Sequence, residues 1–351
     1  MPLRAALERT LTAAWQQRGP LACSLRPLAS LYGVLAARQQ TRASAAAQRL
    51  PVPVIVVGNV VAGGAGKTPV TLALARHLQA RGWRPGIVSR GHGRASADCR
   101  EVHPDSPVAE VGDEPLLLRR KSGLPVFVAP ARAQAGRALL AAHPDCTLLL
   151  CDDGLQHRAL ARDVEICVFD GRGIGNGWLL PAGPLRQPWP PAPGQRRPDL
   201  ALLTEAPPPA LPCPAGLPVY QARRQLGAHA LAQSGAPTPL HSLRGQPLIA
   251  VAGIARPQAF FNMLQAAGLT LAHSFALPDH HAYTRLPQPL ARAIAQAQAA
   301  GQPIVCTEKD APKLWPHAPA ALAVPLEMEL PPAFPAALDA LLPPPPAPPA
   351  P

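Results

Sequence analysis

The sequence predicts an α/β protein with a larger domain built on a parallel sheet, a second, smaller C-terminal α/β domain and an N-terminal apolar helix. Three observations lead to this fold class. Short apolar segments alternate with segments of helical spacing, a glycine-rich loop joins the first strand to the first helix, and the alternation resumes after an irregular stretch. Strands that alternate with helices form βαβ units and therefore a parallel sheet.

The larger domain is expected at residues 51–226. Its predicted strands are short apolar runs at 53–57, 85–88, 125–128, 147–151, 165–169 and 200–203. Uninterrupted apolar runs of this length are typical of strands that are buried on both faces of a sheet. Helical spacing between them, for example at 70–80 and 131–142, predicts the helices that cover the sheet.

The smaller domain is expected at 244–330, with strands at 248–252 and 304–307 and a helix at 257–267. The polar and irregular residues 227–243 are interpreted as a linker. Residues 331–351 are rich in Pro and Ala, which predicts a partly disordered tail.

The N-terminal region, residues 1–50, contains a mostly apolar stretch at 20–37 whose only charge is Arg26, with further arginines on both sides. A spanning helix needs about 20 apolar residues, so this stretch is short for that purpose. An apolar helix with a basic rim is typical of an anchor that lies on an anionic membrane surface. The alternative is an amphipathic helix packed on its own domain, and the basic rim favours the membrane.

The formal net charge of +12 and the sequence pI of about 10.1 suit three kinds of partner: nucleic acid, an anionic membrane or a phosphorylated substrate. Aromatic residues make up only 4% of the chain, and the sequence has no zinc-finger or other nucleic-acid-binding pattern. We therefore expect no nucleic-acid partner.

The glycine-rich loop lies between the strand at 53–57 and the helix at 70–80, which is the context of a phosphate-binding P-loop. Backbone N–H groups of such a loop wrap a phosphate, Lys67 would reach the β- and γ-phosphates, and Thr68 would bind Mg²⁺. The strict pattern begins with Gly where this chain has Val61, so the loop is a GGxGKT variant. The candidate nucleotide ligands are eight consecutive residues: Val61, Ala62, Gly63, Gly64, Ala65, Gly66, Lys67 and Thr68.

Two adjacent carboxylates, Asp152 and Asp153, follow the apolar strand at 147–151. Ligands of open parallel sheets bind at the carboxyl ends of the strands, so either carboxylate could organise Mg²⁺. The alternative is a turn in which an Asp caps a helix. Two acids after an apolar strand, in a chain with a P-loop, favour the metal role.

The roles of three further groups of residues cannot be assigned from the residues alone. Asp113 and Glu114 begin an apolar helix, where Asp113 as a helix cap is the simpler interpretation. Arg90 lies among glycines and could clamp a phosphate or belong to a solvated loop. Residues 279–281 read Asp-His-His, and a His that is hydrogen-bonded to a carboxylate could act as a general base.

Taken together, these motifs resemble the tetraacyldisaccharide 4'-kinases, a family of lipid A biosynthesis. Each motif is weak by itself, but their fixed order over most of the chain makes the resemblance specific. The matching motifs are LYG at 31–33, VGN at 57–59, GGAGKTP at 63–69, SRG at 89–91, VGDEP at 111–115, DDGLQH at 152–157, GNG at 175–177, PAGPLR at 181–186, GI at 253–254 with FF at 260–261, DHH at 279–281 and TEKD at 307–310.

The resemblance implies a kinase that transfers the γ-phosphate of ATP to the 4'-hydroxyl of a tetraacyl glucosamine disaccharide 1-phosphate, giving lipid IVA. It implies ATP and Mg²⁺ as cofactors. The implied partners are the lipid A disaccharide precursor and the anionic surface of the bacterial inner membrane, on its cytoplasmic face. We expect a monomeric enzyme.

The resemblance also implies roles for individual residues. Asp113 becomes the base for the 4'-hydroxyl, with His280, in preference to its neighbour His281, orienting it or sharing the proton. Arg186 becomes a candidate for stabilising phosphate or transition-state charge. The expected catalytic residues are therefore Asp113, His280, Lys67 and Arg186, and the expected metal ligands are Thr68, Glu114, Asp152 and Asp153.

Two other classes of P-loop protein stay open. A membrane-associated partition ATPase would carry a signature Lys before the double Gly, where this chain has Ala62. An ATP-dependent small-molecule ligase of the same fold should not need a basic, apolar N-terminus.

Overall fold

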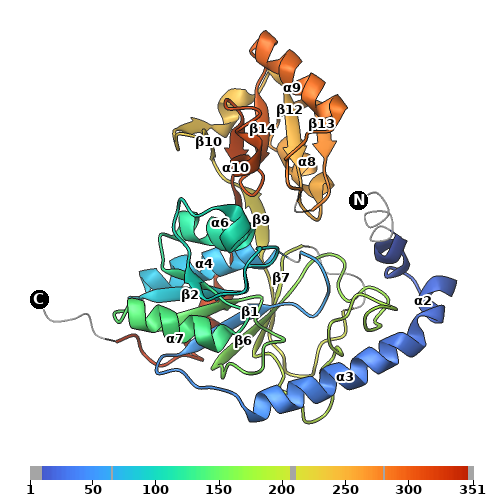
Figure 1. The fold of residues 1–351 in the computed structure, drawn as a ribbon, viewed down its shortest axis with the longest axis vertical. Coiled ribbons are helices and arrows are strands. Elements are labelled where there is room, and N and C mark those ends of the chain that lie inside the picture. Colours follow the sequence, from blue (N-terminus) through green and yellow to red (C-terminus); the bar gives the residue numbers. More distant parts are fainter. Residues whose placement is uncertain (1–9, 65, 206–210, 280, 347–351) are drawn as a thin grey trace, which may run out of the picture. The chain divides into compact units, whose positions relative to one another are not determined.

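The computed structural model describes residues 10–346 except 65, 206–210 and 280, and the chain divides into two compact units (Figure 1). Unit 1 comprises Met1–Arg223 and Met328–Pro351, and unit 2 comprises Arg224–Glu327. The chain leaves unit 1 along β9 (Arg223–Leu226) and returns along β16 (Leu326–Glu329). These two strands pair with each other in a two-stranded sheet.

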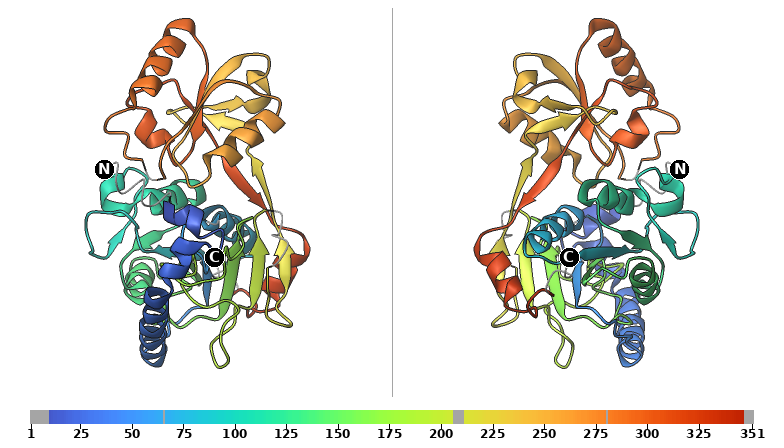
Figure 2. Two further views of the ribbon diagram at one scale, coloured as in Figure 1. Left: turned by 90° about the vertical axis from the view of Figure 1, so that its right-hand side faces the viewer. Right: turned by 90° about the vertical axis from the view of Figure 1, so that its left-hand side faces the viewer.

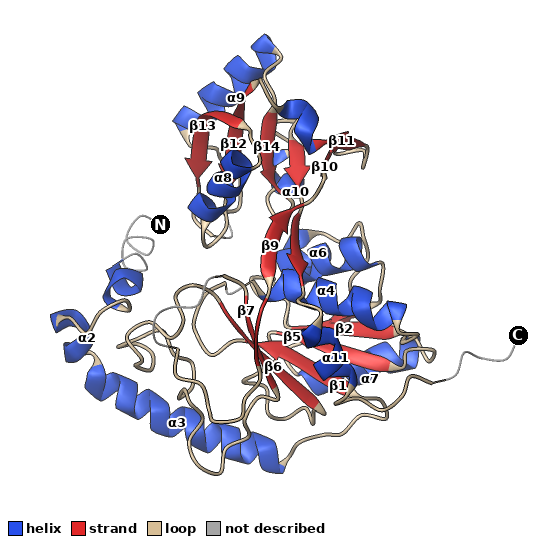
Figure 3. Ribbon diagram, turned by 180° about the vertical axis from the view of Figure 1, so that it is seen from behind, coloured by secondary structure: helices blue, strands red, loops and turns tan. Residues whose placement is uncertain are grey.

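Unit 1 is built on an eight-stranded sheet in the order β3-β4-β2-β5-β1-β6-β7-β8 (Figure 3). All neighbouring strands are parallel except β3 and β4, which are antiparallel. The strands are β1 (Val54–Gly58), β2 (Pro85–Ser89), β3 (Arg100–Glu101), β4 (Val126–Val128), β5 (Leu148–Asp152), β6 (Val164–Phe169), β7 (Leu200–Leu203) and β8 (Val219–Gln221). The predicted parallel α/β sheet is thus confirmed.

Helices cover both faces of this sheet, which explains why its central strands are uninterrupted apolar runs. In β1, Ile55 and Val57 pack on the side of α4, whereas Val54 and Val56 pack on the side of α7. The helices that follow the N-terminal region in unit 1 are α4 (Lys67–Ala80), α5 (Val108–Val111), α6 (Asp113–Ser122), α7 (Arg132–Ala142) and α11 (Ala333–Asp339).

Unit 2 is a smaller α/β unit, as the sequence predicts. Its six-stranded sheet has the order β11-β10-β15-β14-β12-β13, and α8 and α9 pack on opposite faces of it (Figure 2). The elements are β10 (His229–Leu231), β11 (Pro237–Pro239), the 3₁₀ helix η1 (Leu240–Leu243), β12 (Pro247–Ala252), α8 (Pro257–Ala266), β13 (Thr270–Ala276), α9 (Gln288–Ala300), β14 (Ile304–Thr307), α10 (Ala311–Leu314) and β15 (Leu322–Val324).

Two segments differ from the sequence-based expectation. Residues 227–243, expected to be a linker, form β10, β11 and η1 within unit 2, and their few buried side chains include Ala230, Leu240 and Leu243. Strands at the edge of a sheet bury few side chains, which is why the segment looks irregular in sequence. The expected tail begins with α11, which packs Phe334 and Leu338 into the core of unit 1.

In the described part of the N-terminal region, residues 10–14 are helical and are followed by α2 (Pro20–Ser24) and α3 (Arg26–Ala45). The helix α3 extends beyond the apolar stretch into its basic flank. Among the helices that the structure describes, none combines the length and the apolar content that a membrane crossing requires. Several large apolar side chains of these helices are nevertheless exposed: Leu21, Leu28, Leu31, Val34 and Leu35.

Candidate active site

The P-loop joins β1 to α4, as the sequence predicts. Gly66 caps α4 with a φ of +80°, a conformation that glycine adopts without strain. The Lys67 side chain is only 9% exposed; its Nζ lies 3.5 Å from Asp153 Oδ1 and donates a 3.4 Å hydrogen bond to Asn59 Oδ1. Thr68 lies half-buried in the first turn of α4, where the helix dipole favours an anion. The predicted ligand Ala65 lies outside the described residues.

The segment that carries Arg186 is hydrogen-bonded to the start of the P-loop. The Ala62 N–H donates to the Pro184 carbonyl at 2.8 Å, and the Arg186 N–H donates to the Val60 carbonyl at 2.7 Å. Val61 forms an isolated antiparallel bridge with the same segment. Val61 and Ala62 therefore hold the Arg186 segment in place, and their expected contacts with the nucleotide stay a prediction.

Asp153 brings three cationic side chains together. Its carboxylate lies 3.5 Å from Lys67 Nζ and 3.1 Å from Arg186 Nη1, and its backbone carbonyl accepts a 3.3 Å hydrogen bond from Arg132 Nη2. Burial acts to raise the pKa of Asp153, but Lys67 and Arg186 outweigh burial and lower this pKa to about 2. The carboxylate therefore stays ionised and holds Lys67 and Arg186 beside the P-loop.

Asp152 is the last residue of β5 and is almost fully buried. Its Oδ1 accepts a 3.1 Å hydrogen bond from Thr71 Oγ1. Burial, helped by the nearby carboxylates of Glu114 and Asp153, raises the pKa of Asp152 to about 7. Its Oδ2 has no hydrogen-bond partner among the described residues. A buried carboxylate oxygen without a partner is unfavourable by itself, so this atom fits a position that a cation would complete.

Glu114 and Asp113 begin α6, which packs against the P-loop helix α4. The N-cap of α6 is Gly112, with a φ of +91°, and no side chain in the described part of the chain makes a capping hydrogen bond to this helix. The interpretation of Asp113 as a helix cap is therefore wrong. Glu114 lies near enough to Asp152 to contribute to its raised pKa, which brings two of the four predicted metal ligands into one neighbourhood.

A magnesium site made of Thr68, Glu114 and Asp152 is consistent with these observations. Among the described residues, no group of three His, Cys, Asp or Glu side chains is arranged to hold a metal ion. Magnesium in phosphate-transferring sites is usually bound by one or two carboxylates together with substrate phosphates and water. The unsatisfied Oδ2 of Asp152 fits that kind of site.

Sequence reasoning missed a basic group behind Asp153. Arg132, at the start of α7, is 2% exposed and donates to the Ala129 and Asp153 carbonyls. Burial lowers the pKa of His157 to about 4, and the positive charges of Arg132 and Arg90 add to this shift. Arg90, left open by the sequence, therefore lies near this group, whereas Arg132 had no motif that would have identified it.

Sequence reasoning also missed a second Asp–Arg pair. Asp170 follows β6 in the same way that Asp153 follows β5, and Arg172 Nη2 lies 2.8 Å from Asp170 Oδ2. The signal was available, because polar residues at the carboxyl ends of the strands next to a P-loop lie at the ligand-binding edge.

His280 lies outside the described residues, so its expected partnership with Asp113 stays a prediction. Its neighbours lie in unit 2. Asp279 forms a 3.0 Å ion pair with Lys309, and His281 Nδ1 accepts a 3.1 Å hydrogen bond from the Tyr283 N–H. Burial, with the charge of Lys313, lowers the pKa of His281. The lowered pKa favours the neutral ring, and His281 is engaged in its own loop.

The parallel sheet, the buried P-loop lysine and the carboxylates at the end of β5 define a P-loop nucleotide-binding enzyme. Comparison with known proteins specifies which one. The family model described as Tetraacyldisaccharide-1-P 4'-kinase matches residues 21–343. The chain belongs to this family.

Individual proteins of this family are also similar to the chain. The tetraacyldisaccharide 4'-kinase of Acidovorax sp. (strain JS42) is 58% identical over 339 residues, covering 96% of this chain and 95% of that protein. The protein of the same name from Delftia acidovorans is 52% identical over 335 residues, covering 94% of each chain. The crystal structure of the apo form of LpxK from Aquifex aeolicus in complex with ATP is similar, with a TM-score of 0.75 and 27% identity over 92% of this chain and 99% of that one.

Proposed function

We propose that this chain transfers the γ-phosphate of ATP to the 4'-hydroxyl of a tetraacyl glucosamine disaccharide 1-phosphate, the step of lipid A biosynthesis that gives lipid IVA. The observation that carries this proposal is the cluster of Lys67, Asp153 and Arg186 beside the P-loop, in a member of the tetraacyldisaccharide 4'-kinase family. Family membership also argues against a partition ATPase or a ligase.

Magnesium would be held by Asp152, Glu114 and Thr68 together with the phosphates of ATP. When bound, the ion supplies positive charge that offsets the phosphate oxygens. The unsatisfied, buried Oδ2 of Asp152 supports this assignment.

The protein's own cations would act on the transferred phosphoryl group. Phosphoryl transfer depends mainly on positioning and on stabilising charge, because the protein takes little part in bond making. Lys67 and Arg186 already lie on one carboxylate, Asp153. Binding of ATP would give both cations a stronger anionic partner in the phosphate chain. Asp113 would accept the proton of the 4'-hydroxyl, with His280 orienting it or sharing the proton.

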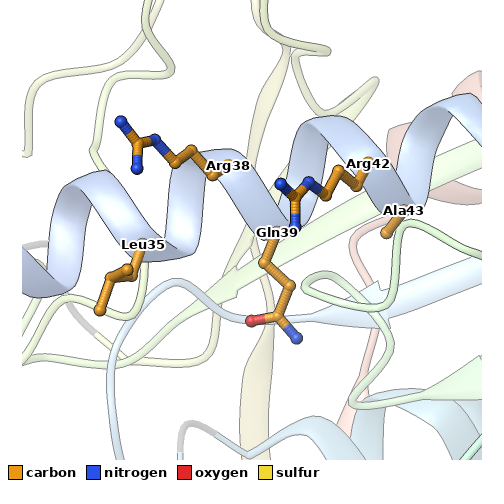
Figure 4. Close-up of a pocket in the computed structure, with 5 residues that line it drawn as sticks. All are labelled: Leu35, Arg38, Gln39, Arg42 and Ala43. Carbon is orange, nitrogen blue, oxygen red and sulfur yellow. The ribbon is translucent and has the colours of Figure 1, made fainter.

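The exposed face of α3 suits a membrane surface. Leu28, Leu31 and Leu35 are each more than half exposed and recur at helical spacing on one side of the helix. Arg38 and Arg42 continue this side and line a hollow that Figure 4 shows together with Leu35, Gln39 and Ala43. We infer that α3 lies on the anionic cytoplasmic face of the inner membrane, with its leucines in the interfacial region and its arginines at the headgroups.

The activity is tested with ATP labelled at the γ-position and the tetraacyl disaccharide 1-phosphate in detergent micelles. We expect the label in a lipid product that carries a second phosphate at the 4'-position. Loss of ATP without labelled lipid would contradict the kinase proposal and favour an ATPase switch.

The membrane proposal is tested with vesicles that contain anionic lipid. We expect Leu28→Ser combined with Leu31→Ser and Leu35→Ser to reduce co-sedimentation at least about tenfold, because each buried leucine contributes about 1.5–3 kcal/mol. Leu341→Ser is the matched control, since Leu341 is also an exposed apolar residue of unit 1 but lies outside α3. Unchanged sedimentation of the triple variant would refute the anchor.

A further inference from the structure

Asp170 and Arg172 form a closely bonded pair directly after β6. The Arg172 Nε donates to both carboxylate oxygens of Asp170, at 3.1 and 2.9 Å, and Nη2 lies 2.8 Å from Oδ2. The backbone N–H of Arg172 also donates to Asp170 Oδ1, at 3.0 Å. Asp170 is 1% exposed. These contacts fix the guanidinium in one orientation, which a long and flexible side chain does not adopt without partners.

The guanidinium held in this way reaches across to the P-loop. Its Nη2 donates a 3.0 Å hydrogen bond to the Gly64 carbonyl. Its Nη1 lies against Gly63, where a Cβ atom would come within 3.2 Å of it. Gly63 has a φ of +93°. Gly63 therefore permits both the backbone turn and the close approach of Arg172.

The hydrogen bond to Gly64 has a consequence for phosphate binding. In a P-loop the N–H groups turn toward the phosphate, so the carbonyls turn away from it. The hydrogen bond from Arg172 holds the Gly64 carbonyl in one direction, as this arrangement of the loop requires. A loop that is held in this orientation before ATP binds loses less conformational freedom when ATP binds.

Arg172 also brings positive charge to a part of the loop that has none of its own. Ala62, directly before the double glycine, has no charged side chain, and Lys67 is paired with Asp153 on the β5 side. The Arg172 charge comes from the β6 side, and its short-range partner is the buried Asp170.

We propose that Arg172 is a positioning residue for ATP binding, which orients the Gly63–Gly64 part of the P-loop from the β6 side and is itself held by Asp170. The inference rests on the proposed function only in taking ATP as the ligand of the loop.

The test is equilibrium binding of Mg-ATP and Mg-ADP to the full chain, measured by calorimetry, together with the melting temperature of each variant. We expect Arg172→Ala to weaken binding of both nucleotides about tenfold, the usual effect of losing one charge-assisted hydrogen bond. Arg172→Lys should restore part of the loss, because one ammonium group cannot bond Asp170 and Gly64 with the geometry of a guanidinium. The melting temperature identifies the variants that stay folded, because Arg172→Ala leaves the buried Asp170 without its cation and is expected to lower it.

The role of Asp170 is tested by a double-mutant cycle. Asp170→Asn should weaken binding about threefold in the wild-type background and should have no further effect in the Arg172→Ala background, because Asp170 acts through Arg172. Arg100→Ala is the matched control: Arg100 has a similarly exposed side chain and pairs with Asp98 and Glu110.

Wild-type nucleotide affinity in a folded Arg172→Ala variant would overturn the inference and leave the kinase proposal standing. Fully additive effects of Asp170→Asn and Arg172→Ala would overturn the part assigned to Asp170. Failure of the wild-type chain to phosphorylate the lipid, with the nucleotide results as expected, would instead count against the proposed function.

Discussion

The two strands that flank β1 are each followed directly by an aspartate with an arginine partner, but the two pairs differ in what they hold. On the β5 side, Asp153 binds Arg186 and Lys67 at once. On the β6 side, Asp170 binds Arg172, whose further contact is the Gly64 carbonyl. The same local pattern therefore holds cationic side chains on one side of the P-loop and the loop's backbone on the other.

This difference teaches how a P-loop of the GGxGKT type can be supported. The β5 side has two adjacent carboxylates, so one can hold cations while the other, Asp152, keeps an oxygen without a protein partner. The β6 side has one buried carboxylate whose charge is met by its own arginine. We expect substitutions on the β5 side to affect transfer and those on the β6 side to affect nucleotide affinity.

The largest effect is expected for Lys67→Ala on the β5 side. Lys67 is a buried cation of the loop itself, and under the proposed function its removal takes away a positive charge that stabilises the γ-phosphoryl group. Transfer to the lipid should fall at least about a thousandfold, in the range seen when a charge-stabilising group is removed. The measurement is the initial rate of labelled lipid formation, and robust activity would refute the P-loop assignment.

Asp113→Ala should be almost as damaging to transfer while sparing ATP binding. A general base contributes about a hundredfold to ten-thousandfold, and Asp113 lies on neither side of the P-loop but at the start of α6. The turnover number should fall by this factor, with the dissociation constant of ATP within about threefold of wild type. Unfolding of the variant would instead indicate a structural role.

Arg186→Ala compares the two arginines directly. Because Arg186 shares Asp153 with Lys67, we expect a loss of about a hundredfold in the transfer rate and only a few-fold change in ATP affinity. Arg172→Ala should instead weaken ATP binding more than it slows transfer at saturating ATP. The two effects are separated by single-turnover kinetics at saturating ATP together with equilibrium binding. If both variants lose transfer rate and ATP affinity in the same proportion, the distinction between the β5 side and the β6 side is wrong.

The smallest expected effect is a pH dependence of the protein's thermal stability that arises from His157, which lies near Arg132 and Arg90. Its pKa is about 4 in the fold against an ordinary 6.5, so the folded state favours the neutral ring. This contribution is fully present above pH 6.5 and is lost as the pH falls toward 4. The melting temperature of wild type should drop a few degrees more over this range than that of His157→Gln. The exposed His103, changed to Gln, is the control.

Some of the site could be predicted from the sequence because its signals are local. The loop at 61–68 and the acids Asp152 and Asp153 each follow an apolar run that forms a buried strand. Asp170 gave the same signal after the strand at 165–169 and was overlooked. Arg132 gave none, since an arginine at the start of a helix is ordinary until burial and a carbonyl partner set it apart.

The sequence by itself determined the parallel α/β fold, the place of the P-loop and, through its ordered motifs, the kinase family. These depend on apolar periodicity and on residues that are neighbours in the chain. Only the tertiary structure decided that Asp153 joins Lys67 to Arg186, that Gly112 rather than Asp113 caps α6, and that Arg172 bonds to Gly64. The pairings with Asp153 and Gly64 join residues that are far apart in the chain, and the packing of parallel strands brings them to one edge.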